Sequence, residues 1–329
     1  FYWLHEGYGD EYFEDHYGKY NGTFEIIQWG ELYDNPNIIG GDEQARAEFE
    51  ELYFKYSAMD LTDEENFKSL CEVFDVNSYL DYFALNLYIG NEDWPHNNYR
   101  VYRYYPAEGE KLREAPFDGK WRFLPHDMDF AFGKYGMRAT TNFLGRVMNG
   151  KSPLFAQLMK REDCRESFVR KTLDLANGAF SPAVLNSVLD EMHESRLNEL
   201  RHTVGTKLVD NWVTEESVRN GIKAIKQYGL VRQSYIIREY NSYFKYGSLY
   251  KLEVTPAEGC KVQINSYVAD SGFTGRYYSD LSTTVAAILP AGKRLDYWLV
   301  NGRKIETDEL VIDSSMIEND MVSVTFAIK

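Results

Sequence analysis

Residues 77–89 read Asn77-Ser78-Tyr79-Leu80-Asp81-Tyr82-Phe83-Ala84-Leu85-Asn86-Leu87-Tyr88-Ile89. Arranged as a helix, this stretch is apolar on nearly every side, which is typical of a helix buried at the centre of a lobe. Gly90 follows and is expected to end the helix, because glycine commonly terminates helices. The sequence therefore predicts a central buried helix, followed by a polar loop over residues 91–98.

The segments on either side of this helix alternate between strand and helix patterns. A hairpin is expected downstream, and two strands and two helices are expected upstream, the second helix after the capping-box pattern Thr62-Asp63-Glu64-Glu65. The predicted hairpin strands are Tyr99–Tyr105 and Trp121–Pro125, and the upstream strands are Phe1–His5 and Thr23–Gln28. The first upstream helix covers residues 42–57, with Asp42 as N-cap, and the second ends near Val73.

The second half of the chain changes character near Gly247. From Ser152 to Tyr246 the pattern favours helices alone, with starts near Ser152, Arg161, Ser181 and Thr214. Residues 249–329 alternate in short strands punctuated by Gly, Asn and Pro, and Asn301-Gly302 is a hairpin-turn signal. We therefore expect an α+β chain: domain 1–246, with a mainly helical C-terminal lobe, and a small all-β module of Ig-like sandwich type at 247–329. The predicted strands of the module are Leu249–Val254, Lys261–Ile264, Thr284–Ala287, Asp296–Val300, Leu310–Ile312 and Val322–Ile328.

Composition narrows the classes of partner. The 329 residues carry 36 Lys and Arg against 51 Asp and Glu, a formal net charge of −15. Nucleic acids and anionic membranes select basic surfaces, so neither is expected as the main partner. No run of 18 apolar residues predicts a membrane span. Cys71, Cys164 and Cys260 are too few and too far apart for a disulfide framework or a Cys-x-x-Cys metal site.

Polar residues cluster where the central helix and the second hairpin strand end. Asp93 and Asn98 are five positions apart in one loop, and Asp127 and Asp129 follow the strand. Oxygen ligands of this kind suit Mg²⁺, which proteins usually bind through one or two carboxylates together with substrate phosphates. The Asp-x₄-Asn spacing also matches a kinase catalytic loop, although Asn91-Glu92 stand where that loop has His-Arg. His96 and His126 lack partners at zinc-ligand spacing.

Two longer motifs carry a resemblance to a known family. They are Asp81-Tyr82-Phe83-Ala84-Leu85-Asn86 through Gly90-Asn91-Glu92-Asp93-Trp94-Pro95-His96-Asn97-Asn98-Tyr99, and Lys120-Trp121-Arg122-Phe123-Leu124-Pro125-His126-Asp127-Met128-Asp129-Phe130-Ala131-Phe132-Gly133. Over roughly residues 1–245 the chain resembles the spore coat protein H (CotH) kinase family, atypical secretory-type protein kinases with a divergent kinase fold. The family commonly has Trp where this chain has His126.

The resemblance implies a role for each site residue. Asp93 would be the catalytic base, and Asn98 and Asp127 would hold Mg²⁺ or Mn²⁺ on the phosphates of ATP. Asp129 would be a supporting ligand, Glu6, in Leu4-His5-Glu6, would position the nucleotide lobe, and Trp94 would line the site. The family's basic phosphate-contacting strand, with its Lys, would lie upstream of the residues given. We therefore expect an upstream part of the nucleotide lobe to be missing, either because the sequence is a fragment or because this homologue has lost it.

Structural interpretations compete with these roles. Asp93 can cap the turn that contains Pro95, and Asn98 can be an ordinary loop hydrogen-bonder. Asp129 and Glu6 can equally be solvated carboxylates. Asp127 follows an apolar strand and precedes Phe130–Phe132, so we expect it to be at least partly buried, where a carboxylate needs a partner or a metal.

Three functions follow from these observations. The first is a metal-dependent transfer of phosphate from ATP to Ser or Thr of a spore-coat or cell-surface protein, with a basic, Ser/Thr-rich substrate outside the cytoplasm. The second is a non-catalytic pseudokinase that serves as a surface scaffold or adhesion protein. The third is a nucleotide-sugar glycosyltransferase, in which Asp127-x-Asp129 would be the metal motif, although such an enzyme needs repeated βα units.

Overall fold

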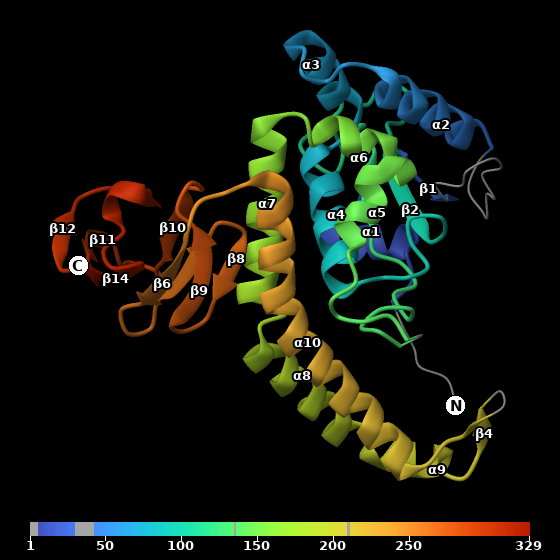
Figure 1. Ribbon diagram of the computed structural model, residues 1–329. Helices are drawn as coiled ribbons and strands as arrows, with labels where there is room; N and C mark the ends of the chain where they lie inside the picture. The colour runs from blue at the N-terminus through green and yellow to red at the C-terminus, as the bar shows by residue number, and fades with distance from the viewer. Residues whose placement is uncertain (1–5, 30–42, 135, 209–210) are drawn as a thin grey trace. The chain divides into compact units, whose positions relative to one another are not determined.

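The computed structural model describes residues 6–29, 43–134, 136–208 and 211–329. The chain forms an α+β protein with two compact units (Figure 1). Unit 1 comprises Phe1–Met137 and Thr141–Arg165, and unit 2 comprises Arg138–Thr140 and Glu166–Lys329. The predicted division after residue 246 stays a prediction. Among the described helices, none is long and apolar enough to cross a membrane.

Unit 1 combines a small sheet with helices. Its strands are β1 (Thr23–Trp29), β2 (Tyr99–Tyr105) and β3 (Arg122–Leu124). The predicted strand Phe1–His5 lies outside the described residues. The helices are α1 (Asp10–Tyr17), α2 (Glu43–Ala58), α3 (Glu64–Val73), α4 (Val76–Ile89), α5 (Phe143–Arg146), η1 (Val147–Lys151) and α6 (Pro153–Leu158), and α7 (Glu162–Asn177) runs on into unit 2.

Helix α4 is the predicted central helix. It begins where the Asp75 side chain accepts a hydrogen bond from the backbone N–H of Ser78, and it ends at Gly90 in the left-handed conformation, with φ 65°. Most of its residues are buried, including Tyr79, Phe83 and Leu87. The all-round apolar pattern therefore predicted the burial of this helix correctly, and Gly90 predicted its end.

The three strands of unit 1 form an antiparallel sheet in the order β1-β2-β3, which confirms the predicted hairpin. One side of the sheet belongs to an aromatic core that α1 completes, made of Phe13, Phe24, Tyr102, Tyr104, Phe117 and Leu124. Phe123, which precedes the core residue Leu124 in β3, packs against Tyr79 of α4, with ring centroids 4.8 Å apart. Because β3 runs directly into Pro125-His126-Asp127, this packing fixes where the loop that carries Asp127 begins.

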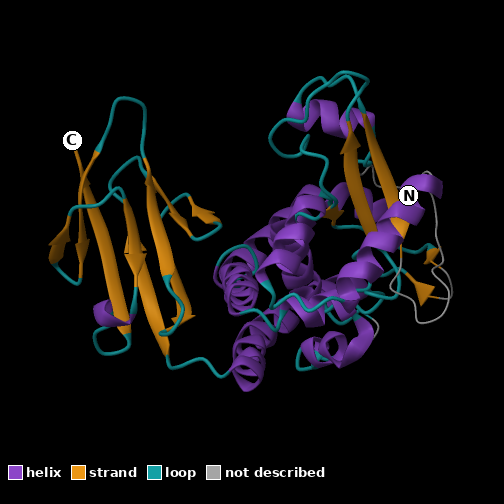
Figure 2. Cartoon of the chain, turned by 90° about the horizontal axis from the view of Figure 1, so that it is seen from above, coloured by secondary structure: helices purple, strands orange, loops and turns teal. Residues whose placement is uncertain are grey.

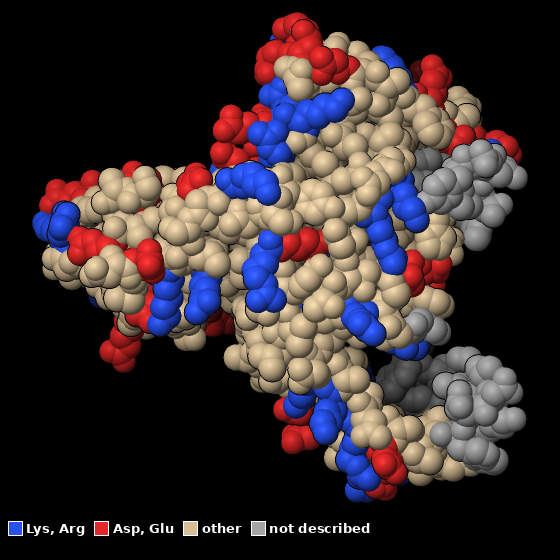
Figure 3. Space-filling view, viewed as in Figure 1, with Lys and Arg blue, Asp and Glu red and all other residues tan. Residues whose placement is uncertain are grey.

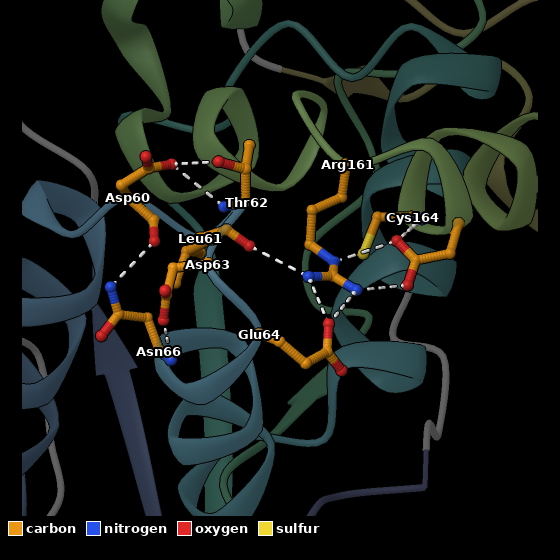
Figure 4. A network of polar contacts seen from close by, with 9 residues as sticks. Asp60, Leu61, Thr62, Asp63, Glu64, Asn66, Arg161 and Cys164 are labelled. Atoms are coloured by element: carbon orange, nitrogen blue, oxygen red, sulfur yellow. Dashed lines mark hydrogen bonds and ion pairs between the residues drawn. The ribbon is translucent and has the colours of Figure 1, made fainter.

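The start of α3 differs from the prediction by one residue. Asp63, not Thr62, is the N-cap: its side chain accepts from the backbone N–H of Asn66 at 3.0 Å. The Thr62 hydroxyl instead donates to Asp60 Oδ1 at 2.7 Å (Figure 4). Arg161 joins this turn to the start of α7, since it donates to the Leu61 carbonyl and lies 3.2 Å from Glu64 Oε2.

The helical part of unit 2 contains α8 (Pro182–Ser195), α9 (Leu197–Thr203) and α10 (Glu215–Phe244). Thr214 caps α10 through a capping box with Ser217. The prediction of helices alone up to Tyr246 is wrong at one place, where β4 (Lys207–Leu208) and β5 (Asn211–Trp212) form a short antiparallel pair. These strands are two residues each, too short to produce an alternating pattern in the sequence.

The C-terminal part of unit 2 is a β module of two sheets (Figure 2), ordered β13-β10-β7-β8 and β12-β11-β14-β6-β9. All six predicted strands are present, and Asn301 and Gly302, with φ 49° and 78°, turn β11 into β12 as expected. The prediction missed β8, β9 and β12, and β14 pairs parallel to β6. The module's strands are β6 (Leu249–Thr255), β7 (Lys261–Ile264), β8 (Tyr267–Ala269), β9 (Phe273–Tyr278), β10 (Thr283–Ile288), β11 (Leu295–Val300), β12 (Arg303–Ile305), β13 (Glu309–Ile312) and β14 (Met321–Ile328), with η2 (Ser314–Met316) before the last. Its Ig-like character stays a prediction.

A buried carboxylate ties the β module to α7 within unit 2. Asp174 Oδ1 accepts from Asn265 Nδ2 at 2.9 Å and from the Tyr277 hydroxyl at 3.0 Å. Its Oδ2 accepts from the backbone N–H and the hydroxyl of Ser266, at 3.2 and 2.8 Å. Asp174 is 3% exposed, so these four donors replace the water that the carboxylate loses.

Replacing Asp174 by Asn is expected to destabilise unit 2 by about 3 kcal/mol, because the new amide N–H₂ would face donors that then lose their acceptor. Urea unfolding of the whole chain measures this loss. Asp190→Asn, at a carboxylate that is 59% exposed on α8, is the matched control and should change the free energy of unfolding little. An unchanged midpoint in Asp174→Asn would contradict the structural role of this carboxylate.

Candidate functional site

The loop after α4 is held by buried amide side chains. Asn86 Nδ2 donates to the Tyr82 carbonyl at 2.9 Å, and Asn86 Oδ1 accepts from Asn91 Nδ2 at 3.0 Å. Asn91 Oδ1 in turn accepts from the backbone N–H of Asp93 at 3.3 Å. Asn86 and Asn91 are each 1% exposed, so this chain of hydrogen bonds fixes the start of the loop from within the core.

Sequence reasoning assigned no role to Asn86 and Asn91. The available signal was a polar side chain in an otherwise apolar helix, followed five residues later by a second amide. Buried amides need hydrogen-bond partners, so such a pair at the end of a buried helix indicates a structured loop.

The side chains of Asp93 and Asn98 contact each other in this loop. Asp93 Oδ2 accepts from Asn98 Nδ2 at 2.9 Å and from Asn97 Nδ2 at 3.1 Å. Asp93 Oδ1 lies 3.2 Å from His96 Nε2, and the Asp93 side chain is 24% exposed. The carboxylate is therefore fixed in orientation but still reachable from solvent, as a base for an external hydroxyl must be.

Asn98 is almost fully buried and connects the two motifs. It is 3% exposed and has the left-handed φ of 61°. Its Nδ2 lies 3.5 Å from the backbone carbonyl of Asp127, and its own carbonyl accepts from the Tyr82 hydroxyl at 3.1 Å. Backbone hydrogen bonds from Glu92 to Phe130 and from Phe132 to Ile89 join the same two loops.

Asp127 is exposed, which corrects the prediction of at least partial burial. The backbone of Asp127 has a positive φ of 48°, so the chain turns away from the strand direction at this residue. Desolvation by the surrounding loop nevertheless raises the pKa of Asp127 above its ordinary value. A hydrogen bond with Asp129 and the charges of Asp129 and Asp93 raise the pKa further, whereas Lys134 opposes the shift.

The other predicted site residues are Asp129, Glu6 and Trp94. Asp129 is 52% exposed and lies 3.3 Å from Lys134 Nζ. Glu6 is 58% exposed and lies 3.0 Å from His16 Nε2; Leu4 and His5 of the same motif are outside the described residues. Trp94 is 5% exposed and its ring lies 4.7 Å from that of Phe83, so most of it is core.

A small cavity lies beside Asp93. Its volume is about 110 Å³, and its lining includes Trp94, His96, Phe143, Arg146 and Lys151. Arg146 Nη1 lies 3.3 Å from Glu92 Oε1, which holds one wall of the cavity in place. On the face of the molecule shown in Figure 3, acidic and basic side chains are interspersed.

The cluster of Asp93, Asn98 and Asp127 suits a cation only when a substrate supplies the other ligands of its coordination shell. Within the described ranges, no three His, Cys, Asp or Glu side chains gather as a metal-binding group. Asn98 Oδ1, the oxygen that an Asn offers to a cation, accepts no hydrogen bond from the described residues, and Asp127 is crowded by two further negative charges. Mg²⁺ typically takes one or two carboxylates and fills its shell with water and phosphate oxygens, so the donor set fits it.

A loop carboxylate that is fixed by an Asn five residues later, beside an acidic group at the end of a strand, is an arrangement found in kinase-like proteins. The CotH kinase protein family model matches residues 8–236, well over half of the chain. The chain therefore belongs to the CotH kinase family and is kinase-like. A search of curated proteins found no match.

Proposed function

We propose that the chain transfers the γ-phosphoryl group of ATP to a Ser or Thr hydroxyl of a protein. The observation that carries this proposal is the meeting of Asp93, Asn98 and the Asp127 backbone, drawn from two loops, in a chain of the CotH kinase family. Positioning and electrostatic stabilisation account for most of the catalysis in such reactions, and both require side chains fixed in this way.

Each residue then has a chemical role. Asp93 would accept the proton of the acceptor hydroxyl. The oxygen of that hydroxyl would bond to the γ-phosphorus of ATP, while the bond between the γ-phosphorus and the ADP oxygen breaks. Asn98 and Asp127 would hold Mg²⁺ or Mn²⁺, with Asp129 as a supporting ligand. The bound cation neutralises phosphate charge. Asn86 and Asn91 would act as positioning residues, since they hold the backbone of Asp93.

The acceptor that we propose is a basic, Ser/Thr-rich protein of the spore coat or cell surface, outside the cytoplasm. The net charge of −15 supports this, because an acidic protein attracts a basic one. Family membership supports the phosphotransferase class but not a particular acceptor.

One observation favours the non-catalytic alternative. The Asp93 carboxylate already faces three side-chain donors, from His96, Asn97 and Asn98. A hydroxyl must join or displace one of them before Asp93 can take its proton. A scaffold that binds nucleotide without transferring phosphate would keep the same contacts.

Replacing Asp127 by Ala is expected to abolish metal-dependent ATP binding. Removal of an outer-sphere partner of a metal costs roughly 10- to 100-fold in affinity, and loss of a direct carboxylate ligand should cost at least as much. Titration calorimetry with ATP, with and without Mg²⁺ or Mn²⁺, measures the effect on the whole chain.

Asp15→Ala, at an exposed carboxylate of α1, is the control for the change in net charge and should bind ATP as the unaltered chain does. Asp129→Ala should weaken binding less than Asp127→Ala, because Asp129 already pairs with Lys134. Equal ATP affinity in the unaltered chain and Asp127→Ala would contradict the proposed site.

A further inference from the structure

Arg100 is a half-buried guanidinium at the start of β2, next to the end of β3. In the register of the sheet it lies between Gln28 of β1 and Leu124 of β3. Arg100 Nη2 donates to Gln28 Oε1 at 3.0 Å and lies 3.1 Å from His126 Nε2. Because a guanidinium has no acceptor, His126 Nε2 accepts in this contact. Two uncharged side chains therefore fix the direction of the Arg100 group.

The charge of Arg100 has no close negative partner. Within the described residues no carboxylate oxygen lies within 4.0 Å of its guanidinium, although the chain has far more acidic than basic residues. Most other described arginines of unit 1 do have such a partner: Arg46, Arg103, Arg113, Arg122, Arg146 and Arg161. A half-buried cation held by neutral groups is ready to bind an anion.

The surroundings of Arg100 place this charge at the candidate site. The alternate residues of β1 and β2, Phe24, Tyr102 and Tyr104, belong to the aromatic core on α1, and Arg100 continues that face of the sheet toward its end. The Tyr8 ring, 5.8 Å from the guanidinium carbon, covers it, and the Tyr8 hydroxyl donates to the Pro125 carbonyl at 2.8 Å. The polypeptide runs on from Pro125 through His126, which contacts Arg100, to Asp127.

Burial lowers the pKa of Arg100, while the charge of Asp127 acts in the opposite direction. Asp127 is therefore close enough to act on Arg100 electrostatically, yet it forms no ion pair with it. A ligand that brings both a cation for Asp127 and an anion for Arg100 would satisfy both groups. A metal-bound polyphosphate has this charge pattern.

We propose that Arg100 is a nucleotide-binding residue whose guanidinium contacts the phosphate chain of ATP beside Asp127, with Gln28 and His126 as its positioning residues. The inference rests on the proposed function and adds the residue that distinguishes a nucleoside triphosphate from a nucleoside. Arginine suits this role because its planar fork of donors matches phosphate oxygens.

The test compares ligands that differ only in phosphate content. ATP, ADP, AMP, adenosine and inorganic tripolyphosphate are titrated calorimetrically, in the presence of Mn²⁺, into the whole chain and into Arg100→Gln and Arg100→Lys. We expect Arg100→Gln to bind ATP and tripolyphosphate about 10- to 100-fold more weakly, as loss of charge-assisted hydrogen bonds predicts. Adenosine binding should not change, and Arg100→Lys should retain part of the affinity for tripolyphosphate.

Arg113→Gln is the matched control, since Arg113 belongs to the same unit, is 48% exposed and stacks on Phe117 of the same aromatic core. It should bind all five ligands as the unaltered chain does. Near-ultraviolet circular dichroism shows whether each variant keeps its aromatic packing, and Arg100→Lys serves as the test if Arg100→Gln does not fold.

Three outcomes would overturn the inference, and they separate it from the proposed function. Equal ATP affinity in the unaltered chain and Arg100→Gln would remove Arg100 while leaving the nucleotide site intact. An equal loss of adenosine and ATP affinity in a folded Arg100→Gln would show a general structural effect. If the unaltered chain binds Mn²⁺, measured by electron paramagnetic resonance, but neither ATP nor tripolyphosphate, the metal site stands and both nucleotide proposals fail.

Discussion

Replacing Asp93 by Asn is expected to lower the rate of phosphate transfer by roughly 10²- to 10⁴-fold, the usual contribution of a general base. The amide is nearly isosteric but cannot take a proton from the acceptor hydroxyl. It also places an N–H₂ group where Asp93 now accepts hydrogen bonds from Asn97 and Asn98. Initial rates with radiolabelled ATP and a Lys- and Ser-rich peptide measure the loss.

ATP binding separates this effect from misfolding or loss of the metal site. Asp93→Asn should still bind ATP in a metal-dependent way, because Asn98 and Asp127 remain. Asp15→Asn makes the same chemical change on an exposed part of α1 and should keep the full rate. An Asp93→Asn variant as active as the unaltered chain would show that Asp93 is not the base.

Replacing Arg122 by Met is expected to destabilise unit 1 by about 3–5 kcal/mol, the usual cost of breaking a buried ion pair from one side. Arg122 is 5% exposed and binds two carboxylates. Its Nη1 and Nη2 each lie 2.7 Å from an oxygen of Asp118, and its Nε lies 3.0 Å from Asp75 Oδ2. Without Arg122 these carboxylates repel each other, and Asp75 also caps α4, which leads to Asp93.

Urea unfolding at neutral pH measures this loss, and Arg113→Met, at the exposed arginine on Phe117, is the control. A loss below about 1 kcal/mol, the range of surface ion pairs, would contradict the structural role of Arg122.

The same ion pair predicts a dependence of stability on pH. Desolvation acts to raise the pKa of Asp118, but hydrogen bonds from Arg122 and from the Lys120 backbone outweigh it and lower the pKa. A lowered pKa stabilises the folded state above the ordinary Asp value of 3.8, and this contribution is lost as pH falls through the folded-state pKa. Arg122→Met should lose less stability than the unaltered chain over this acidic range.

The sequence predicted best where burial and periodicity coincide. The all-round apolar pattern located α4 and its end at Gly90, and the Asn301-Gly302 turn and the alternation of six strands located most of the β module. The pairing of Asp93 with Asn98 was also predictable, because five residues in one loop bring both side chains within reach.

What the sequence could not predict depends on contacts between distant residues or on backbone turns. Burial of Asp127 was inferred from its apolar neighbours in the sequence. The chain turns at Asp127, where φ is 48°, and the side chain of Asp127 is exposed. The position of Arg100 at the candidate site is not predictable from the sequence, because Gln28 and His126, which fix its side chain, are 72 and 26 positions away. Strand β9 pairs regularly with β6, but the sequence did not predict it, because Gly275 interrupts its apolar pattern.

Transfer of labelled phosphate to a peptide hydroxyl is the direct test of the proposed activity. The chain is incubated with γ-³²P-ATP and Mn²⁺ over an array of basic Ser- and Thr-containing peptides, with and without EDTA. We predict label on Ser or Thr that disappears with EDTA and in Asp93→Asn. Metal-dependent ATP binding without label on any peptide or on the chain itself would contradict catalysis and favour the non-catalytic scaffold.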